Sequence, residues 1–473
     1  MKGKIEAYFS YGNCFRTEAE IFYPENLEEL KSILVFCRDN GRKITVGGTF
    51  NSFDLQNSGK DIVVSMQRFN AIEYDAKTHT IRVGAGAKWG DIFDVVYENR
   101  CALYTCITGT QPSAGGTLSI NSNSVWSPAN GKEGNHCLGF EILTSDGELL
   151  TCSRSENSEL FYGAIAGMGM LGFITRITYQ LHFVGCHYDI QIWVEDHDNV
   201  DDLEQKFDLR KSPNFDDLEC LRSQSSLFYS DGGRPKFGMY NRRYRRRKDK
   251  RKTSSLLFNA AILASGIVRF FPSLADVLLK SEVGRSSAQR RVLRGLESVK
   301  PGLFWAEPDY VWSKYIGKYL KEVGYEPLLY QNSYFIPFGD EKVTLFTKTV
   351  YRLLHEYGLK TFMFDVMYLP RDEPFVLSCS RFSEGFYVNM TFMEKTNKEG
   401  LKQFYAKLNR LALKLGGRMN LSKNCYVDIE ILAQMHAPEM TEFMALKAKY
   451  DSLNLLQSNF FDKYFAVFLP QRS

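Results

Sequence analysis

The sequence predicts an α+β protein in which two domains share a large interior. A chain of 473 residues is too long for one ordinary core. Residues 1–185 combine short apolar runs with two glycine-rich loops, residues 186–415 alternate strands with amphipathic helices, and residues 416–473 form a C-terminal tail. These patterns favour a sheet backed by helices in the second domain.

The elements of the first domain follow one another closely. Asn26 and Glu29 form a capping-box pattern that begins a helix of about four turns, and Gly41 ends this helix. Strands are expected at 43–46, 61–66 and 80–86, a helix at 89–97, and a hairpin of strands at 140–144 and 149–152.

The second domain shows both periodicities. Strands are expected at 330–337, 360–369 and 386–392. Helices are expected at 341–357 and 400–415, because the apolar residues of each segment share one helical face. Gly416 and Gly417 end the second of these helices.

Composition excludes several classes of protein. The chain is 44% hydrophobic and 24% charged, with a net charge of +4, which is typical of a folded protein and offers no nucleic-acid surface. Its ten cysteines form no C-x-x-C pair and no zinc-ligand spacing, so we expect no metal site and thiols kept reduced in the cytoplasm. The N-terminus lacks the apolar core of a secretory signal, and no clean apolar run is long enough to span a membrane.

A basic segment interrupts the second domain within an insert at about 240–300. Arginines and lysines dominate 242–252, and an apolar stretch follows at 256–279. The combination is typical of a segment that lies on an anionic membrane, so residues 242–280 are a candidate for peripheral contact with the cytoplasmic membrane face. A solvated loop followed by a packed helix explains the same residues equally well.

Two glycine-rich loops carry the main functional signal. The first contains Gly47, Gly48, Thr49, Phe50, Asn51 and Ser52, and the second contains Thr110, Gln111, Pro112, Ser113, Gly115 and Gly116. Successive backbone N–H groups in such a loop can bind a diphosphate, and glycine allows close approach of a ligand to the backbone. Neither loop matches a Rossmann or a Walker motif, which argues against nicotinamide binding and phosphoryl transfer.

The order of these motifs resembles the FAD-binding domain of the vanillyl-alcohol oxidase and p-cresol methylhydroxylase type. The resemblance covers roughly residues 10–180 and includes Val83–Trp89, Gly134-Asn135-His136 and the Gly-x-Gly-x-x-Gly-x-Ile-Thr run at 167–175. Within that family, the run Gly416–Lys423 is similar to a motif of the decaprenylphosphoryl-ribose 2-oxidases and their bacterial relatives.

The resemblance implies a two-lobed FAD-binding domain followed by an α+β substrate domain, with the C-terminal tail returning to the first domain. The first loop would bind the pyrophosphate and the second would pass along the flavin. Further residues implied in cofactor binding are Asn121, Asn123, Gly131, Asn135, Gly172, Ile174 and Lys423. Lys423 would lie at the pyrimidine edge of the flavin, where a cation stabilises the negative charge of the reduced ring.

The sequence departs from this pattern at informative positions. Asn51 stands where many members of the family carry the histidine that tethers FAD, so non-covalent FAD is expected. The histidine and cysteine of the oxidase group fall on Asn123 and Asn389, which we expect to line the substrate. Candidates for proton transfer are then Lys423, Tyr334 and Tyr387, although both tyrosines fit ordinary half-buried strand positions slightly better. His136 matches a structural position of the family.

These features predict an FAD-dependent oxidoreductase that oxidises an alcohol carbon of a sugar or lipid-linked sugar-like substrate by hydride transfer to the flavin. Two alternatives remain open at this stage. One is a flavin-dependent double-bond reductase of the sterol type, and the other is a non-catalytic flavin-binding protein at a membrane.

Overall fold

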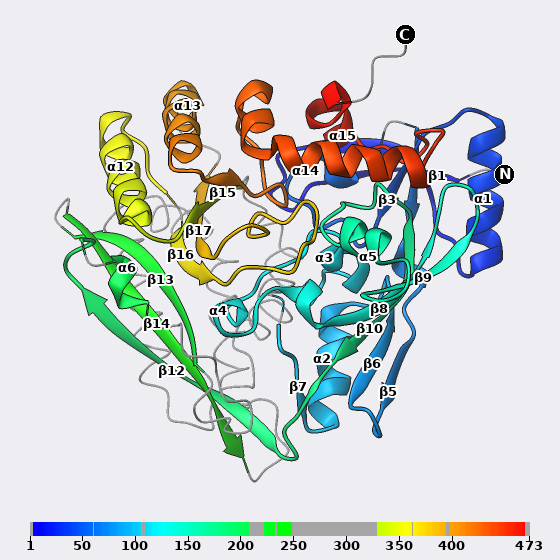
Figure 1. Ribbon diagram of the computed structural model, residues 1–473, viewed down its shortest axis with the longest axis horizontal. Helices are drawn as coiled ribbons and strands as arrows, with labels where there is room; N and C mark the ends of the chain where they lie inside the picture. Colours follow the sequence, from blue (N-terminus) through cyan, green and yellow to red (C-terminus); the bar gives the residue numbers. More distant parts are fainter. Residues whose placement is uncertain are drawn as a thin grey trace, which may run out of the picture.

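The computed structural model describes most of the chain on both sides of the basic insert (Figure 1). The described residues are 3–59, 61–105, 107, 109–201, 203–207, 222–231, 234–247, 329–361, 363–393 and 398–468. They form an α+β structure with two sheets in the N-terminal region and a larger sheet in the central region, which confirms the predicted fold class.

The first sheet has four strands in the order β1-β2-β4-β3. Its elements are β1 (Lys4–Phe9), β2 (Arg16–Phe22), β3 (Ile44–Gly47) and β4 (Ile62–Ser65), with α1 (Leu27–Asp39) between β2 and β3. The predicted cap of α1 is confirmed, because the Asn26 side chain accepts a hydrogen bond from the Glu29 N–H at 2.9 Å. The parallel pair β3 and β4 delivers the first glycine-rich loop from its carboxyl end.

The second sheet has five strands in the order β5-β6-β10-β8-β9. Its elements are β5 (Ile72–Asp75), β6 (Thr80–Gly84), β8 (Cys137–Leu143), β9 (Leu149–Ser153) and β10 (Phe173–Gln180). The short strands β7 (Cys101–Ala102) and β11 (His182–Phe183) form a separate pair. The helices of this part are α2 (Trp89–Glu98), α3 (Ala114–Leu118), α4 (Ser127–Asn130) and α5 (Ser158–Ala164).

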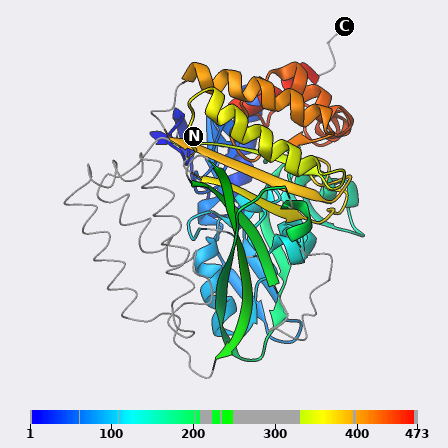
Figure 2. The same ribbon diagram turned by 90° about the vertical axis from the view of Figure 1, so that its left-hand side faces the viewer.

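The third sheet has seven strands in the order β12-β14-β13-β16-β17-β15-β18. Its strands are β12 (His187–His197), β13 (Arg222–Asp231), β14 (Arg234–Arg247), β15 (Leu329–Pro337), β16 (Met363–Leu369), β17 (Gly385–Met393) and β18 (Arg418–Met419). Helices α12 (Lys342–Glu356) and α13 (Lys398–Lys414) lie side by side over one face of this sheet (Figures 1 and 2), and the short α6 (Leu203–Lys206) lies near α12.

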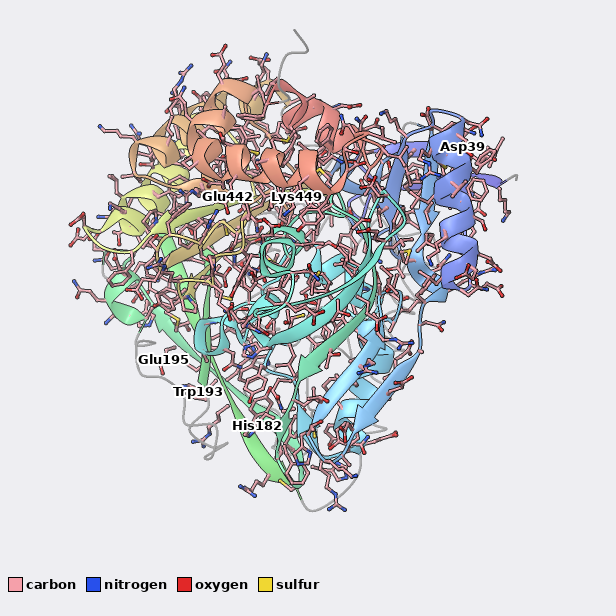
Figure 3. All side chains as sticks on the ribbon, turned by 45° about the vertical axis from the view of Figure 1, so that its right-hand side comes forward. Asp39, His182, Trp193, Glu195, Glu442 and Lys449 are labelled. Atoms are coloured by element: carbon pink, nitrogen blue, oxygen red, sulfur yellow. The ribbon has the colours of Figure 1, made fainter. Side chains whose placement is uncertain are left out.

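The C-terminal tail carries α14 (Ile429–Tyr450) and α15 (Asn459–Tyr464) and packs on the N-terminal region. The Ile44 N–H donates to the Leu455 carbonyl at 2.9 Å, and the Gln457 N–H donates to the Ile44 carbonyl at 2.8 Å. In Figure 3, α14 with Glu442 and Lys449 crosses the upper part of the molecule, whereas Trp193 and Glu195 of β12 lie at the lower left. The tail therefore connects the seven-stranded sheet with the first sheet.

The first part of the basic segment is a strand. Arg242 to Arg247 belong to β14 and pair with β12 on one side, so the interpretation as a solvated loop is wrong for them, whereas contact with a membrane stays a prediction. Tyr244 stacks on Trp126 at 4.4 Å, which anchors β14 to the N-terminal region. Residues 248–280 lie outside the described residues. Within the described ranges, no helix is long and apolar enough to cross a membrane.

Candidate active site

The two glycine-rich loops meet in space, although more than fifty residues separate them. The Thr49 Oγ1 donates to the Gln111 carbonyl at 2.8 Å. A Cβ at Gly48 would lie 2.3 Å from the Ser113 Oγ, so only glycine allows this approach. The Gly116 Cα would lie 4.0 Å from the same Cβ on Gly48, so Gly116 also faces the first loop.

The residues of these loops leave an accessible backbone that fits a bound cofactor. Gly116 is exposed, and a Cβ there would meet only the Ser113 Oγ at 3.1 Å. Phe50 adopts a positive φ of 58°, and the Asn51 Nδ2 donates to Thr49, which keeps the first loop tightly turned. Backbone groups with no side chain in front of them are what a diphosphate and a flat ring require. The loops therefore fit FAD.

Gly47, Ser52, Thr110, Pro112 and Gly115 support the same loops from within. The Ser52 carbonyl accepts from the Tyr11 N–H at 2.7 Å, and the Thr110 and Pro112 carbonyls accept from the first N–H groups of α2. A Cβ at Gly115 would lie 2.7 Å from the Ala85 Cβ, and one at Gly47 would lie 3.1 Å from the Phe50 ring. These glycines are required by packing within the protein.

Three other predicted cofactor residues, Asn121, Gly131 and Asn135, contact other parts of the protein. The Asn121 side chain accepts from the Gly134 N–H and donates to Asp372, so both of its polar atoms are engaged within the protein. Gly131 has a φ of 77° and packs directly on Asn135, whose Oδ1 is buried without a hydrogen-bond partner in the described part of the chain.

Gly172 and Ile174 belong to the five-stranded sheet. Ile174 pairs with Ile142 of β8, and a Cβ at Gly172 would lie 2.7 Å from that isoleucine side chain. The described contacts of both residues are with β8, so the structure gives them a packing role and no direct link to the loops.

One face of the seven-stranded sheet gathers polar side chains from three neighbouring strands. Residues alternate across the two faces of a strand, and the register places Ser333 of β15 opposite Asn389 of β17, and Asn389 opposite Asp365 of β16. Tyr387 lies on the same face, two residues before Asn389. We call Ser333, Asp365, Tyr387 and Asn389 the polar face.

The polar face is connected by directed hydrogen bonds. The Tyr387 hydroxyl donates to the Ser333 Oγ at 2.7 Å, and the Ser333 hydroxyl donates to the Asn389 Oδ1 at 2.8 Å. The Asn389 Nδ2 then donates to the Asp365 Oδ1 at 2.8 Å. The chain of bonds ends on Asp365 and fixes the orientation of its carboxyl group.

Lys423 lies where the polar face meets the first glycine-rich loop. Its ammonium sits 3.9 Å from the centre of the Phe53 ring, and the Asn424 Nδ2 beside it donates to the Phe53 carbonyl at 2.8 Å. On the other side, the charge of Asp365 acts on Lys423. The structure therefore brings together the predicted Lys423, Tyr387 and Asn389.

Burial shifts the pKa values of the two charged groups of this site, Asp365 and Lys423, toward neutral pH. It raises the pKa of Asp365 to about 6, against the opposing effects of the Asn389 hydrogen bond and the Lys423 charge. It lowers the pKa of Lys423 to about 8, and here Asp365 opposes the shift. Both side chains are only half-buried, so solvent reaches them although protein surrounds them. Titratable groups with such shifts are typical of functional sites.

The two predicted tyrosines lie on opposite faces of the sheet. Tyr334 is fully buried among the residues beneath α12 and α13, and its hydroxyl donates to the Asn409 Oδ1 at 2.6 Å. This position separates it from the polar face. Burial raises the pKa of Tyr387 strongly, so the lowered pKa that a tyrosine base would need is not found. We assign Tyr387 to orienting Ser333.

Two residues of the second loop region differ in their surroundings. Asn123 is half-buried, and the structure gives it no hydrogen bond within the described ranges, which is compatible with a ligand contact.

His136 has its Nε2 at 2.6 Å from the Asn130 carbonyl and stacks on Tyr104 at 4.3 Å. Burial lowers the pKa of His136 to about 4, so it is a neutral structural residue.

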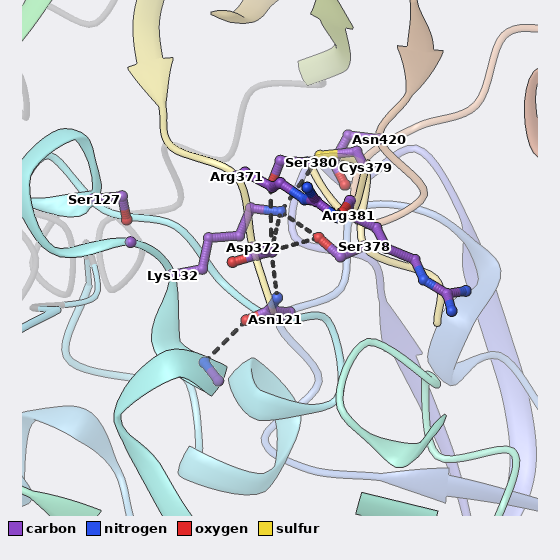
Figure 4. A network of polar contacts seen from close by, with 12 residues as sticks. Asn121, Ser127, Lys132, Arg371, Asp372, Ser378, Cys379, Ser380, Arg381 and Asn420 are labelled. Atoms are coloured by element: carbon purple, nitrogen blue, oxygen red, sulfur yellow. Dashed lines mark hydrogen bonds and ion pairs between the residues drawn. The ribbon is translucent and has the colours of Figure 1, made fainter. Parts of the chain in front are cut away.

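A buried lysine, Lys132, lies near the polar face, and sequence reasoning missed it. Lys132 pairs with Asp372 at 3.1 Å and donates to the Ser378 Oγ at 2.7 Å, within a network that also contains Asn121, Cys379 and Ser380 (Figure 4). Cys379 belongs to the same small buried cluster as Tyr387. Despite the cost of burial, the negative charge of Asp372 raises the pKa of Lys132, which therefore stays protonated.

Asp365 was the other omission, although the sequence carries a signal for it. It is the single charged residue of the run Met-Phe-Asp-Val-Met-Tyr-Leu, and a carboxylate in an apolar strand needs a partner or a function. Ser333 has no comparable signal, since its role depends on the pairing of β15 with β17.

The chain was compared with known proteins. Residues 19–153 match a family described as an FAD binding domain. The chain is 26% identical over 172 residues to a D-arabinono-1,4-lactone oxidase of Debaryomyces hansenii, covering 33% of this chain and 31% of that protein. It is 27% identical over 175 residues to cytokinin dehydrogenase 2 of Arabidopsis thaliana, with 36% and 35% covered, and 25% identical over 173 residues to the L-gulonolactone oxidase of Bos taurus, with 36% and 38% covered.

The matched segments span about a third of the length of these relatives. The family match ends at residue 153, and the polar face lies beyond it. The accessible glycine-rich loops lie inside that match. Residues 19–153 are therefore an FAD-binding domain, similar to that of FAD-linked oxidoreductases such as the sugar-lactone oxidases, and an α+β region follows them.

Proposed function

We propose that this protein is an FAD-dependent oxidoreductase that oxidises an alcohol carbon of a sugar or sugar-like substrate. The observation that carries the proposal is Asp365, a carboxyl with a pKa of about 6 held on the polar face beside Lys423. When bound, FAD supplies a hydride acceptor. The protein must then supply a base for the hydroxyl proton and a positive charge.

Asp365 is the base in this proposal. Above pH 6 its carboxylate is ionised, and its Oδ1 is already engaged by the Asn389 Nδ2, so the Oδ2 is the atom that accepts the proton. The bonds from Tyr387 through Ser333 to Asn389 hold the carboxyl group in one orientation. A base oriented by a further hydrogen-bonded group is the arrangement that such catalysis requires.

Lys423 provides the positive charge and Asn123 and Asn389 provide polar contacts for the substrate. The ammonium lies between the Phe53 ring and the polar face, so it can act on both the cofactor and the substrate side. A face of hydroxyl, amide and carboxyl groups suits a polyhydroxylated substrate. The names of two relatives, a D-arabinono-1,4-lactone oxidase and an L-gulonolactone oxidase, support a sugar derivative. A lipid-linked form of that substrate depends on 248–280, outside the described residues.

The direct test is anaerobic mixing of the holoprotein with D-arabinono-1,4-lactone, L-gulonolactone and a series of sugars and polyols, followed at the flavin absorbance. We expect at least one of them to bleach the flavin. Asp365→Asn should slow bleaching by about a hundredfold or more, whereas Asp39→Asn, an exposed change on α1, should leave it unchanged. Bleaching by NADPH alone would favour a double-bond reductase, and no bleaching by any reagent would favour a binding protein.

We also propose that FAD is bound without a covalent link. Asn51 occupies the first loop at the tethering position implied by the family resemblance, and its side chain is turned back onto Thr49. Acid precipitation should therefore release free FAD into the supernatant. Yellow colour that stays with the pellet would overturn this part of the proposal.

A further inference from the structure

The carboxyl group of Asp372 is the centre of a buried polar network (Figure 4). Its Oδ2 accepts from the Asn121 Nδ2 at 2.9 Å, from the Ser378 hydroxyl at 2.5 Å and from the Ser380 hydroxyl at 3.2 Å. The same oxygen lies 3.1 Å from the Lys132 Nζ, and the two side chains are 1% and 5% exposed. The Oδ1 is buried and has no hydrogen-bond partner in the described part of the chain.

This network joins segments that carry the two halves of the candidate site. Asp372 follows β16, the strand that holds Asp365, by three residues. Asn121 follows α3, the helix that contains Gly115 and Gly116, by the same number. One carboxyl group therefore connects the strand of the proposed base with the second glycine-rich loop.

The partners of Asp372 carry the connection further on each side. Asn121 adopts a positive φ of 44°, and its Oδ1 accepts from the Gly134 N–H at 2.9 Å. Lys132 also lies 3.5 Å from the Cys379 Sγ, and Cys379 belongs to the same small buried cluster as Tyr387 of the polar face. Lys132 is thus linked to the polar face through this cluster.

A buried ion pair is a costly way to stabilise a fold, because apolar side chains of the same volume often serve as well or better. A buried ion pair that is also hydrogen-bonded to its neighbours does, however, fix the relative positions of the segments that carry it, because all of these bonds form in one arrangement only. The four side chains that contact the Asp372 carboxyl group, those of Asn121, Lys132, Ser378 and Ser380, all contribute to the same junction.

We infer that Asp372 and Lys132 are positioning residues that set the register between the FAD-binding domain and the polar face. They act through Asn121 on the second glycine-rich loop and through β16 on Asp365. The kinetic consequence rests on the proposed function, whereas the structural coupling of the two segments does not.

The test compares Asp372→Asn with Asp451→Asn. Asp451 forms another buried ion pair, with Lys447, that holds the C-terminal tail and lies outside this network. Both variants should lose thermal stability. In Asp372→Asn alone, we expect hydrogen exchange to rise together in 114–122, 131–136 and 371–381, because the shared carboxylate is gone. We also expect the rate of anaerobic bleaching by D-arabinono-1,4-lactone, counted per bound flavin, to fall about tenfold to a hundredfold.

The double variant Lys132→Met/Asp372→Asn removes the unpaired buried charge and should recover stability without recovering the rate. It also serves if the single variant does not fold. A rate per bound flavin equal to that of the parent, or exchange that rises in only one of the segments, would overturn the inference and leave the pair a local element of stability. If no alcohol bleaches the parent, the proposed function fails while the exchange data still decide the inference.

Discussion

The two faces of the seven-stranded sheet use the same strands for different purposes. On one face, Tyr334, Val366 and Val388 pack beneath α12 and α13 and are fully buried. On the other, Ser333, Asp365 and Asn389 come from neighbouring positions on the same strands and form the polar face. A shift of one residue therefore separates a core residue from a candidate catalytic one.

The same contrast between regions applies to the whole site, in which cofactor binding and proton transfer are assigned to different parts of the chain. The FAD-binding domain binds its cofactor mainly with backbone groups that glycines leave accessible. The polar face contributes Asp365, and Lys423 lies beside it; the pKa values of these two groups have moved toward neutral pH. If this division is correct, changes at the loops should affect flavin binding, and changes at the polar face should affect the rate.

The largest effect is expected from Gly116→Val. The new side chain would meet only the Ser113 Oγ within the protein, so the variant should fold, but it would occupy the accessible backbone proposed for the cofactor. Flavin content of the purified protein, read from its absorbance, should fall to near zero. Gly115→Val is the matched comparison and should impair folding, since its Cβ would lie 2.7 Å from the Ala85 Cβ. Normal FAD in Gly116→Val would place the cofactor elsewhere.

Lys423→Met should separate rate from binding. Removing one electrostatic partner of the reacting groups costs roughly 3 kcal/mol, or about a hundredfold in the rate of flavin reduction. FAD content should be preserved, because the loops hold the cofactor, and the flavin reduction potential should fall. Lys463→Met, a change of an exposed lysine on α15, is the control. Loss of flavin in Lys423→Met would make Lys423 a binding residue, and parental behaviour would remove it from the site.

The pH dependence of flavin reduction should be bell-shaped, with limbs near pH 6 and pH 8. Asp365 must be ionised to accept a proton, so the rate should fall about tenfold per pH unit below a pKa of about 6. Lys423 must be protonated, so the rate should fall as the pH rises above its pKa of about 8. Stopped-flow reduction across pH 5–10 measures both limbs. Lys423→Met should abolish the alkaline limb only, and a profile that is flat across this range would refute both assignments.

The sequence predicted the fold better than the site. The capping pattern at Asn26, the periodicity of α12 and α13 and the strands β3, β4, β6, β8 and β9 are local signals, and each of these elements was found within a few residues of its predicted position. The strand β14 was missed, because arginines from 242 to 247 dominate its sequence, and the pairing with β12 that makes them a strand is a long-range contact.

For the site, the outcome depended on the kind of residue. Glycine-rich loops are recognisable because backbone geometry restricts the residue type, and the two loops do meet. Asp365, Ser333 and Lys132 come from separate segments, and only the strand register and the packing of loops bring them near Lys423 or Tyr387. The face on which a tyrosine lies follows from register in the same way, so Tyr334 and Tyr387 could not be distinguished in advance.

The smallest and sharpest test uses these two tyrosines. Tyr387→Phe removes the hydroxyl that donates to Ser333 and so loosens the orientation of Asp365, which should slow flavin reduction by about threefold to tenfold, or about 1 kcal/mol. Tyr334→Phe leaves the Asn409 Oδ1 without its donor beneath α12 and α13, so it should cost about 1 kcal/mol of unfolding free energy and leave the rate unchanged. Stopped-flow reduction and denaturant unfolding of both variants provide the comparison. If Tyr334→Phe slowed reduction as much as Tyr387→Phe while both proteins kept their flavin, the two faces would not be functionally distinct, and the polar face would lose its place as the catalytic side of the sheet.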